Sequence, residues 1–189
     1  MAGSEGSVCP WWIGWLLASP LRRLAHDPAT IVAPYVRDGM TVLEPGPGMG
    51  FFTLELARRV GPAGRVVPVD LQPRMLAGLR RRAARAGLLE RLTLRVATPD
   101  SLGVADLAGA VDFALVFAVV HELPAARPFF REVAGVLKPG GRLLLAEPSG
   151  HVSVAAFEAE LQAAGEAGLR VAEHPAVRWS RAAVLAKPP

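Results

Sequence analysis

The chain has 189 residues and a single cysteine, Cys9, and this scarcity removes two kinds of architecture. One thiol cannot form an internal disulfide framework, and it offers no thiolate cluster to a structural metal ion. No group of carboxylates has the spacing of metal ligands either, which disfavours a magnesium-assisted reaction. We therefore predict a cytoplasmic protein that works without a metal.

No apolar run is long enough to cross a membrane. The best candidate, Trp11 to Leu17, falls far short of the roughly 20 residues that a spanning helix needs. Its arginines follow the apolar stretch, whereas a secretory signal carries them in front. The sequence therefore predicts neither a membrane span nor an export signal.

Lysine is almost absent, so the net charge of +4 rests on arginine. Arg80 to Arg82 and Arg85 form the densest basic stretch, which raises the question of a nucleic-acid partner. No aromatic residues alternate with these arginines to stack on bases. We interpret the stretch as a solvated helix face and do not expect a nucleic-acid partner.

Apolar strand patterns alternate with helical patterns from residue 29 to the end of the chain, which indicates one domain, 29–189, after an N-terminal segment, 1–28. Nearly continuous apolar strands separated by helices are typical of a parallel sheet covered on both faces. We predict an α/β fold: a doubly wound, Rossmann-like, mostly parallel seven-stranded sheet with an antiparallel hairpin at one edge. The expected strands are 40–45, 64–70, 92–97, 111–120, 141–148, 169–178 and 179–187, and the expected helices are 29–35, 51–60, 73–87, 126–137 and 153–168.

A glycine-rich turn, "VLEPGPGMG", follows the first expected strand. Gly46, Gly48 and Gly50 let a backbone turn sharply and approach a ligand more closely than a Cβ would allow. Open α/β sheets bind ligands at this end of their strands, so a nucleotide-like cofactor is the expected occupant. The glycine spacing differs from the dinucleotide pattern, and Glu44 beside it suits a cationic amino group better than a pyrophosphate.

Asp70 ends the second expected strand, 20 residues after Gly50. A carboxylate at this place can accept hydrogen bonds from both hydroxyls of a ribose. The alternative is a capping role for the helix that starts near Pro73. The glycine loop one strand away favours ribose binding.

Five stretches in order resemble the class I S-adenosylmethionine-dependent methyltransferases: "VLEPGPGMG", "VVPVDLQPRML", "RVATPDSLG", "VDFALVFAVVHELP" and "LKPGGRLLLAEP". The resemblance covers about residues 29–189. It implies S-adenosylmethionine as cofactor, with its methionine moiety along the three glycines and its amino group near Glu44. By the same resemblance Asp70 holds the ribose, Leu71 packs on the adenine, and Phe117 belongs to the cofactor site.

The third of these stretches departs from the family pattern. The family often has Gly-Asp-Ala here, where this chain has Ala97, Thr98 and Pro99. Proline has no N–H to donate to the adenine edge. Thr98, Asp100 or a shifted loop must then read the adenine.

The catalytic candidates are His121 and Glu122, just past the fourth expected strand. Histidine titrates near neutrality and suits a general base, but a residue here can also simply line the site. Glu147, Ser149 and His151 follow the fifth strand, where they could bind polar groups of a substrate or order the loop. Arsenic methylation of the usual kind relies on several cysteines, which this chain lacks.

Three tryptophans, Trp11, Trp12 and Trp15, mark the N-terminal segment. The segment could form a lid over an apolar pocket, an anchor to a membrane surface, or a helix packed on the sheet or on a second subunit of a homodimer. With no long insertion elsewhere, a small, apolar or aromatic acceptor is expected.

The leading hypothesis is a metal-independent methyltransferase that acts on a small molecule by in-line displacement. A nicotinamide-dependent oxidoreductase, a methyltransferase of a membrane lipid or quinone, and a binding module without catalysis are the alternatives.

Overall fold

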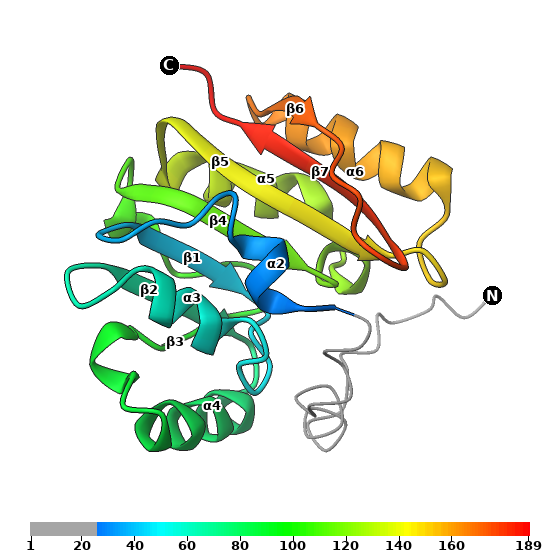
Figure 1. Cartoon of the computed structure of the whole chain (residues 1–189). Helices are drawn as coiled ribbons and strands as arrows, with labels where there is room; N and C mark the ends of the chain where they lie inside the picture. The colour runs from blue at the N-terminus through cyan, green and yellow to red at the C-terminus, as the bar shows by residue number, and fades with distance from the viewer. Residues whose placement is uncertain (1–25) are drawn as a thin grey trace.

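The computed structural model describes residues 26–189, and these form a seven-stranded sheet with helices on both sides (Figure 1). The strands lie in the order β3-β2-β1-β4-β5-β7-β6. β1 to β5 run parallel, and β7 lies antiparallel between β5 and β6. The predicted fold class, including the antiparallel edge hairpin, is confirmed. The tryptophan segment lies outside the described residues, so its three interpretations stay predictions.

The strand bounds follow the sequence predictions closely in the centre of the sheet and less closely at its edges. The strands are β1 (Thr41–Pro45), β2 (Arg65–Asp70), β3 (Arg95–Val96), β4 (Val111–Phe117), β5 (Leu137–Pro148), β6 (Arg170–Glu173) and β7 (Ser180–Ala186). β3 is much shorter than expected, and β5 begins four residues early because it continues directly from a helix.

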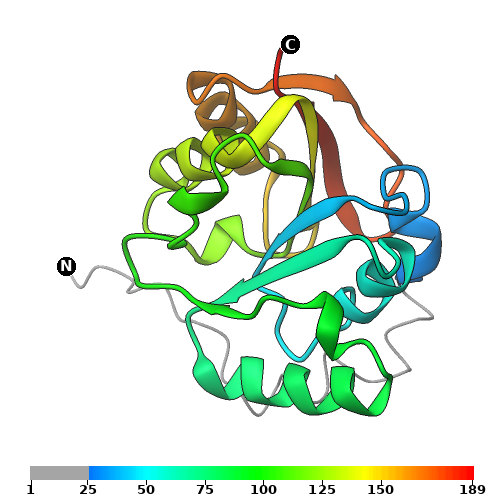
Figure 2. The same ribbon diagram turned by 90° about the vertical axis from the view of Figure 1, so that its left-hand side faces the viewer.

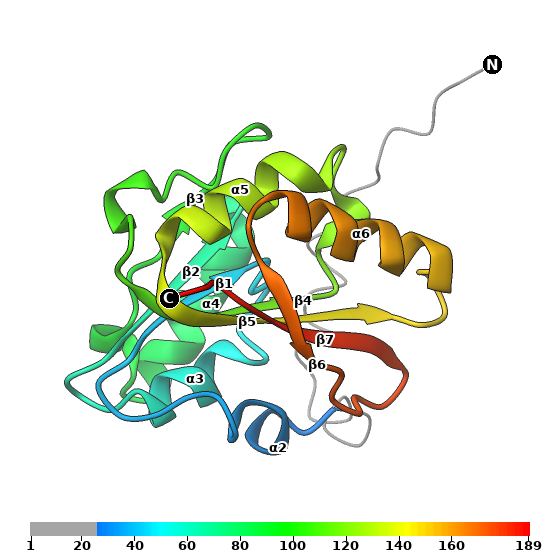
Figure 3. The ribbon, with the colours of Figure 1, turned by 90° about the horizontal axis from the view of Figure 1, so that it is seen from above.

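Within residues 26–189, α-helices precede and connect these strands. They are α2 (Pro28–Val32), α3 (Thr53–Arg59), α4 (Pro73–Arg85), α5 (Ala126–Val136) and α6 (Val154–Glu166), with short 3₁₀ turns η2 (Leu89–Arg91), η3 (Ala105–Leu107) and η4 (Val120–Glu122). Seen from above, α2 and α3 lie on one side of the sheet and α5 and α6 on the other (Figure 3). None of the helices within residues 26–189 is long and apolar enough to cross a bilayer.

The central strands are apolar on both faces because each face is covered by helices. In β5, Leu143 and Leu145 belong to the core under α5 and α6, while Leu144 and Ala146 belong to the core under α2 and α3. Successive side chains of a strand point to opposite faces, so a continuous apolar run fills both cores at once. This is the physical basis of the parallel-sheet prediction.

β4 ends three residues earlier than predicted. Phe117 is its last residue, and Ala118 has a φ of +59°, which turns the chain out of the sheet. The Ala118 N–H still donates to the Ala146 carbonyl at 2.8 Å, so the turn stays tied to β5. The chain then enters η4, which carries His121 and Glu122. In Figure 2 the orange helix α6 and the blue helix α2 lie on opposite sides of the sheet.

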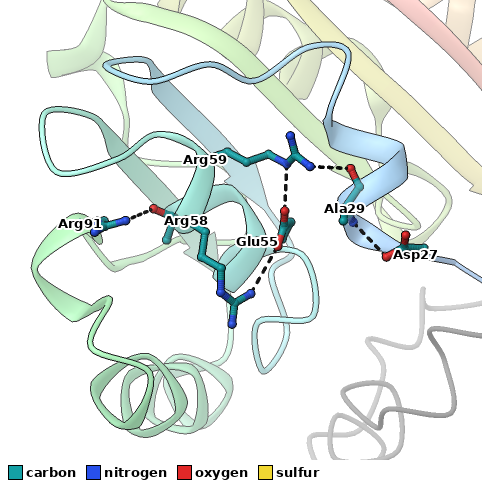
Figure 4. A network of polar contacts seen from close by, with 7 residues as sticks. Asp27, Ala29, Glu55, Arg58, Arg59 and Arg91 are labelled. Atoms are coloured by element: carbon teal, nitrogen blue, oxygen red, sulfur yellow. Dashed lines mark hydrogen bonds and ion pairs between the residues drawn. The ribbon is translucent and has the colours of Figure 1, made fainter.

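A polar network joins α2 to α3 beside the start of the described chain (Figure 4). Asp27 caps α2 by accepting from the Ala29 N–H at 3.2 Å. Arg59 donates to the Ala29 carbonyl at 3.0 Å and pairs with Glu55 at 2.9 Å, one turn back on α3. The short α2, which has little stability of its own, is thus held by its neighbour.

Leu144→Ala should lower the free energy of unfolding by about 2–5 kcal/mol, because the side chain is fully buried in a central strand. Val154→Ala is the control: Val154 is 55% exposed at the start of α6, and surface changes of this kind cost within about 0.5 kcal/mol. Urea denaturation of both variants measures the difference. Equal midpoints would contradict this placement of β5.

Candidate functional site

A cavity of about 480 Å³ opens at the carboxyl ends of β1, β2, β4 and β5. β1 pairs with β2 on one side and β4 on the other, so the chain winds in opposite directions from this point. Such a switch point is where open α/β sheets bind ligands. The lining is mainly apolar and comprises Pro45 to Met49, Phe51, Val69 to Gln72, Met75, Ala97, Leu102, Phe117 to Val119, His121 to Leu123, Phe129, Pro148 and His151.

The glycine loop forms one wall, and Gly46 and Gly48 are needed there for different reasons. Both have positive φ angles, +65° and +54°. A Cβ on Gly46 would come within 2.5 Å of the Val119 side chain, whereas a Cβ on Gly48 would meet no protein atom within 4 Å. Gly46 therefore permits packing within the protein, and Gly48 leaves open space on the cavity side.

Gly50 does not line the cavity. Its N–H closes the turn by donating to the Pro47 carbonyl at 2.9 Å. Arg82, from the arginine stretch of α4, donates to the Met49 carbonyl in the same turn. At least one member of that stretch therefore supports the loop.

Glu44 lies at the end of β1 beneath the loop and is only 3% exposed. Its Oε2 has no hydrogen-bond partner among the described residues. Burial raises the pKa of Glu44 to about 8; the adjacent Thr53 hydroxyl acts to lower this pKa, and the nearby Asp70 carboxylate adds a smaller increase. A buried carboxyl oxygen without a partner fits the predicted place for a cationic group, although Glu44 does not itself line the cavity.

Asp70 lines the cavity at the end of β2. Its Oδ1 accepts from the Gln72 N–H at 2.8 Å, so part of the carboxylate orders the turn before α4. Burial is the main reason that the pKa of Asp70 rises to about 6, and the negative charge of Glu122 adds to it. Asp70 thus orders the start of α4, as the capping alternative expects, and it also lines the cavity.

Leu71 and Phe117 lie in the cavity wall, as the resemblance implies. Leu71 is 38% exposed, so its side chain is accessible to a ligand in the cavity. Phe117 packs against Phe52, with ring centroids 4.6 Å apart, and against His26 at 5.0 Å. His26 also forms a hydrogen bond with the Arg178 carbonyl, at 2.8 Å.

Thr98 and Asp100 are exposed and lie outside the cavity lining. Thr98 instead pairs with Ser101 in a tight turn, while Ala97 and Leu102 reach the cavity. Glu132 of α5 holds this turn by accepting from the Leu102 N–H at 3.0 Å. That Thr98 or Asp100 reads the adenine stays a prediction.

His121 and Glu122 both line the cavity, and both lie in η4 beyond the end of β4. The imidazole Nδ1 of His121 is in hydrogen-bond contact with Oε2 of Glu147, which is 0% exposed. The Glu147 carboxyl is therefore beneath the rim rather than in the substrate space. His151 lines the cavity beside His121, with ring centroids 6.2 Å apart, whereas Ser149 donates to the Trp179 carbonyl at 3.0 Å.

Several lining residues carry no motif that would reveal them. Met49, Phe51, Met75 and Phe129 supply apolar surface to the cavity. Any core residue could be apolar, so only their position at the crevice distinguishes them.

A family model described as a methyltransferase domain matches residues 43–145, which is more than half of the chain. The chain belongs to this methyltransferase family. The predicted family is confirmed.

Similar proteins include named methyltransferases of several kinds. The chain is 34% identical over 109 residues to an arsenite methyltransferase of Halobacterium salinarum, covering 58% of this chain and 27% of that protein. It is 31% identical over 118 residues to a ubiquinone/menaquinone biosynthesis C-methyltransferase of Pasteurella multocida, covering 62% of this chain and 43% of that protein. The methyltransferase chain thus spans less than half the length of both.

The crystal structure of a SAM-dependent methyltransferase from Aquifex aeolicus shares the fold of this methyltransferase chain. The TM-score is 0.83 at 24% identity, over 95% of this chain and 98% of that one. The coverage of both chains shows that they share this fold over most of their length.

The residues of this methyltransferase fit the expected cofactor on two structural grounds. Gly48 leaves a space that a Cβ would fill, and Glu44 presents a buried oxygen with no partner among residues 26–189. The cofactor carries an amino group that suits the second feature. Asp70 and Leu71, side by side at the end of β2, suit a ribose and an adenine ring.

Gly48→Ala should weaken binding of S-adenosylhomocysteine by tenfold or more while the protein still folds, because the new methyl group enters the open space. Gly39→Ala is matched to it: Gly39 has a φ of +79° and open space around it, but lies outside the cavity. Both variants carry the same backbone strain of about 1 kcal/mol. Calorimetric titration distinguishes them, and equal affinities would contradict a ligand at Gly48.

Binding of S-adenosylmethionine near neutral pH should release protons from Glu44. Its pKa of about 8 leaves much of the carboxyl protonated there, and a cation placed against it favours the ionised form. Titration calorimetry in buffers of different ionisation enthalpy counts the protons. Glu44→Gln should lower the count by up to about one. The same count in both proteins would mean that the amino group binds elsewhere.

Proposed function

We propose that this protein transfers a methyl group from S-adenosylmethionine to a small acceptor with an apolar or aromatic body, without a metal. The observation that carries the proposal is the mainly apolar cavity at the switch point, which is lined by Asp70 at the end of β2 and by His121 just beyond β4. S-adenosylmethionine supplies an activated methyl group on a positively charged sulfur.

In this proposal, different lining residues hold the cofactor and the acceptor. Asp70 and Leu71 on the β2 side would hold the nucleoside part of the cofactor, while the glycine loop would hold its amino acid part. His121 and His151 lie at the ends of β4 and β5, where an acceptor would lie. Methyl transfer in line needs mainly alignment of donor and acceptor and exclusion of water, which an apolar cavity provides.

An aromatic or quinone-type acceptor is supported by the cavity wall and by the relative named for ubiquinone/menaquinone biosynthesis. Phe51, Phe117 and Phe129 line the cavity with flat apolar surface. An arsenite acceptor, as the other relative is named for, is disfavoured because the chain has only Cys9 to offer as a soft ligand. His121 and Glu122 stay the catalytic candidates.

Asp70→Ala should weaken binding of S-adenosylmethionine and S-adenosylhomocysteine by about 10- to 100-fold, the usual effect of losing hydrogen bonds to a charged group. The wild type should bind both compounds and not NAD. Affinity of the wild type should also fall as the pH drops through about 6, because the protonated Asp70 accepts hydrogen bonds less well. Calorimetric titration measures all three expectations.

Glu158→Ala is the control, since this glutamate is exposed on α6 and away from the cavity. Binding of NAD in place of the two sulfur compounds would overturn the proposal and favour an oxidoreductase.

A further inference from the structure

The Glu147 carboxylate joins two parts of the cavity rim, although no part of it is exposed. Its Oε1 accepts from the Val119 N–H at 3.0 Å and from the Val120 N–H at 2.8 Å. Its Oε2 contacts Nδ1 of His121. Each carboxylate oxygen thus has a partner, all from the segment that leaves β4.

The same segment reaches the glycine loop through Val119. Its Cγ2 lies 2.5 Å from the place that a Cβ on Gly46 would take, so Val119 packs directly on that backbone. Glu147 therefore holds the His121 ring and, through Val119, the glycine-loop wall of the cavity in one arrangement. If the carboxylate served only to order the loop, its hydrogen bonds to the two backbone N–H groups would be sufficient. The contact with His121 is an additional interaction that this role does not require.

We infer that Glu147 holds His121 with its proton on Nδ1, so that the bare Nε2 faces the cavity as the general base for an acidic hydroxyl of the acceptor. This inference rests on the proposed function. An ionised carboxylate only accepts hydrogen bonds, so it selects the Nδ1–H form of a neutral ring. Nε2 is the ring nitrogen left for the cavity, and no described residue hydrogen-bonds to it.

The step balances with the groups at hand. Nε2 of His121 takes the hydroxyl proton, and the acceptor oxygen forms a bond to the methyl carbon. The carbon–sulfur bond breaks, and its electron pair neutralises the sulfur, which leaves as the thioether. The resulting imidazolium is paired with the Glu147 carboxylate and later returns its proton to water.

A phenol- or enol-type hydroxyl fits this base and this cavity. An imidazole can remove a proton from a phenol, whose pKa is near 10, far more readily than from an alkyl alcohol. A neutral phenol can also enter an apolar cavity without charge, whereas an ammonium group would carry its charge into it. The ring would lie against the phenylalanine surface of the wall.

The other charged and titratable groups near Glu147 do not replace His121 as its partner. Glu160 of α6 packs near Glu147; its own burial, and then the Glu147 charge, raise the pKa of Glu160 to about 8, so it is largely neutral at pH 7. Arg181 lies opposite Glu147 on β7, but its Nε donates to the Val152 carbonyl at 2.9 Å. His151 and Glu122 line the same cavity.

Glu147→Gln separates the two tasks of this residue. The amide oxygen can still accept from Val119 and Val120, while the amide NH₂ facing His121 forces the ring to accept at Nδ1 and to carry its proton on Nε2. Nitrogen-15 NMR of the neutral histidines, with the His121 signals assigned by their loss in His121→Ala, should show an Nδ1–H ring in the wild type and an Nε2–H ring in Glu147→Gln.

Glu160→Gln is the matched control, a second buried glutamate whose charge is already largely lost at pH 7. It should leave the His121 signals unchanged. An Nε2–H ring in the wild type would overturn the inference, because Nε2 would then have no free pair to accept a proton.

Binding of 4-nitrophenol to the protein saturated with S-adenosylhomocysteine tests the base without turnover. Its visible absorbance reports the phenolate, so the wild type should increase the bound phenolate fraction, and His121→Ala and Glu147→Gln should reduce that fraction by tenfold or more. Unchanged absorbance in both variants, no binding of 4-nitrophenol, or binding of benzylamine in its place would overturn the inference.

The two proposals fail in different ways. If S-adenosylhomocysteine does not bind to the wild type, the proposed function is wrong. If it binds with equal affinity to wild type and Glu147→Gln while the His121 ring and the phenolate signal do not change, only the inference about Glu147 is wrong.

Discussion

The pairing of β1 with both β2 and β4 is the constraint on which the rest of the structure depends. It places the ends of four parallel strands at one edge and sends their connections in opposite directions, which opens the crevice. The glycine loop, Asp70 and the segment that leaves β4 meet there although they are distant in sequence. Apolar side chains on both faces of the strands hold the sheet between its helices, so the crevice has a rigid floor.

Carboxylates at this edge differ in function because their surroundings differ. Glu147 has all its oxygens paired and is suited to hold other groups in place. Glu44 is also buried, but its Oε2 has no hydrogen-bond partner within residues 26–189, which suits the predicted cationic group. Asp70 is shared between the turn before α4 and the cavity. Burial raises the pKa of Glu44 and Asp70, so ligand binding and proton binding are linked at both.

Much of the fold could be predicted because its signals are local. Continuous apolar runs, helical periodicity and glycine turns predicted the fold class and most of the bounds of the strands and helices. The failures lie where tertiary contacts override local pattern. β3 keeps only two paired residues at the sheet edge, and β4 stops at Phe117 because the chain turns at Ala118 and is tied to Glu147. No pattern within the apolar run 111–120 marks that point.

The sequence alone determined the family and the crevice end of the sheet, and it predicted loop and strand-end residues for a cofactor site, since these depend on backbone conformations and residue types within short stretches. The tertiary structure decided which polar groups meet. Glu147 and His121 are 26 residues apart in the chain, and only the parallel pairing of β4 with β5 brings them into contact. Likewise, only the tertiary structure shows that Thr98 and Asp100 are exposed and are not among the residues that line the cavity. Hydrogen bonds between distant residues are set by strand register and packing, and no single stretch of sequence encodes them.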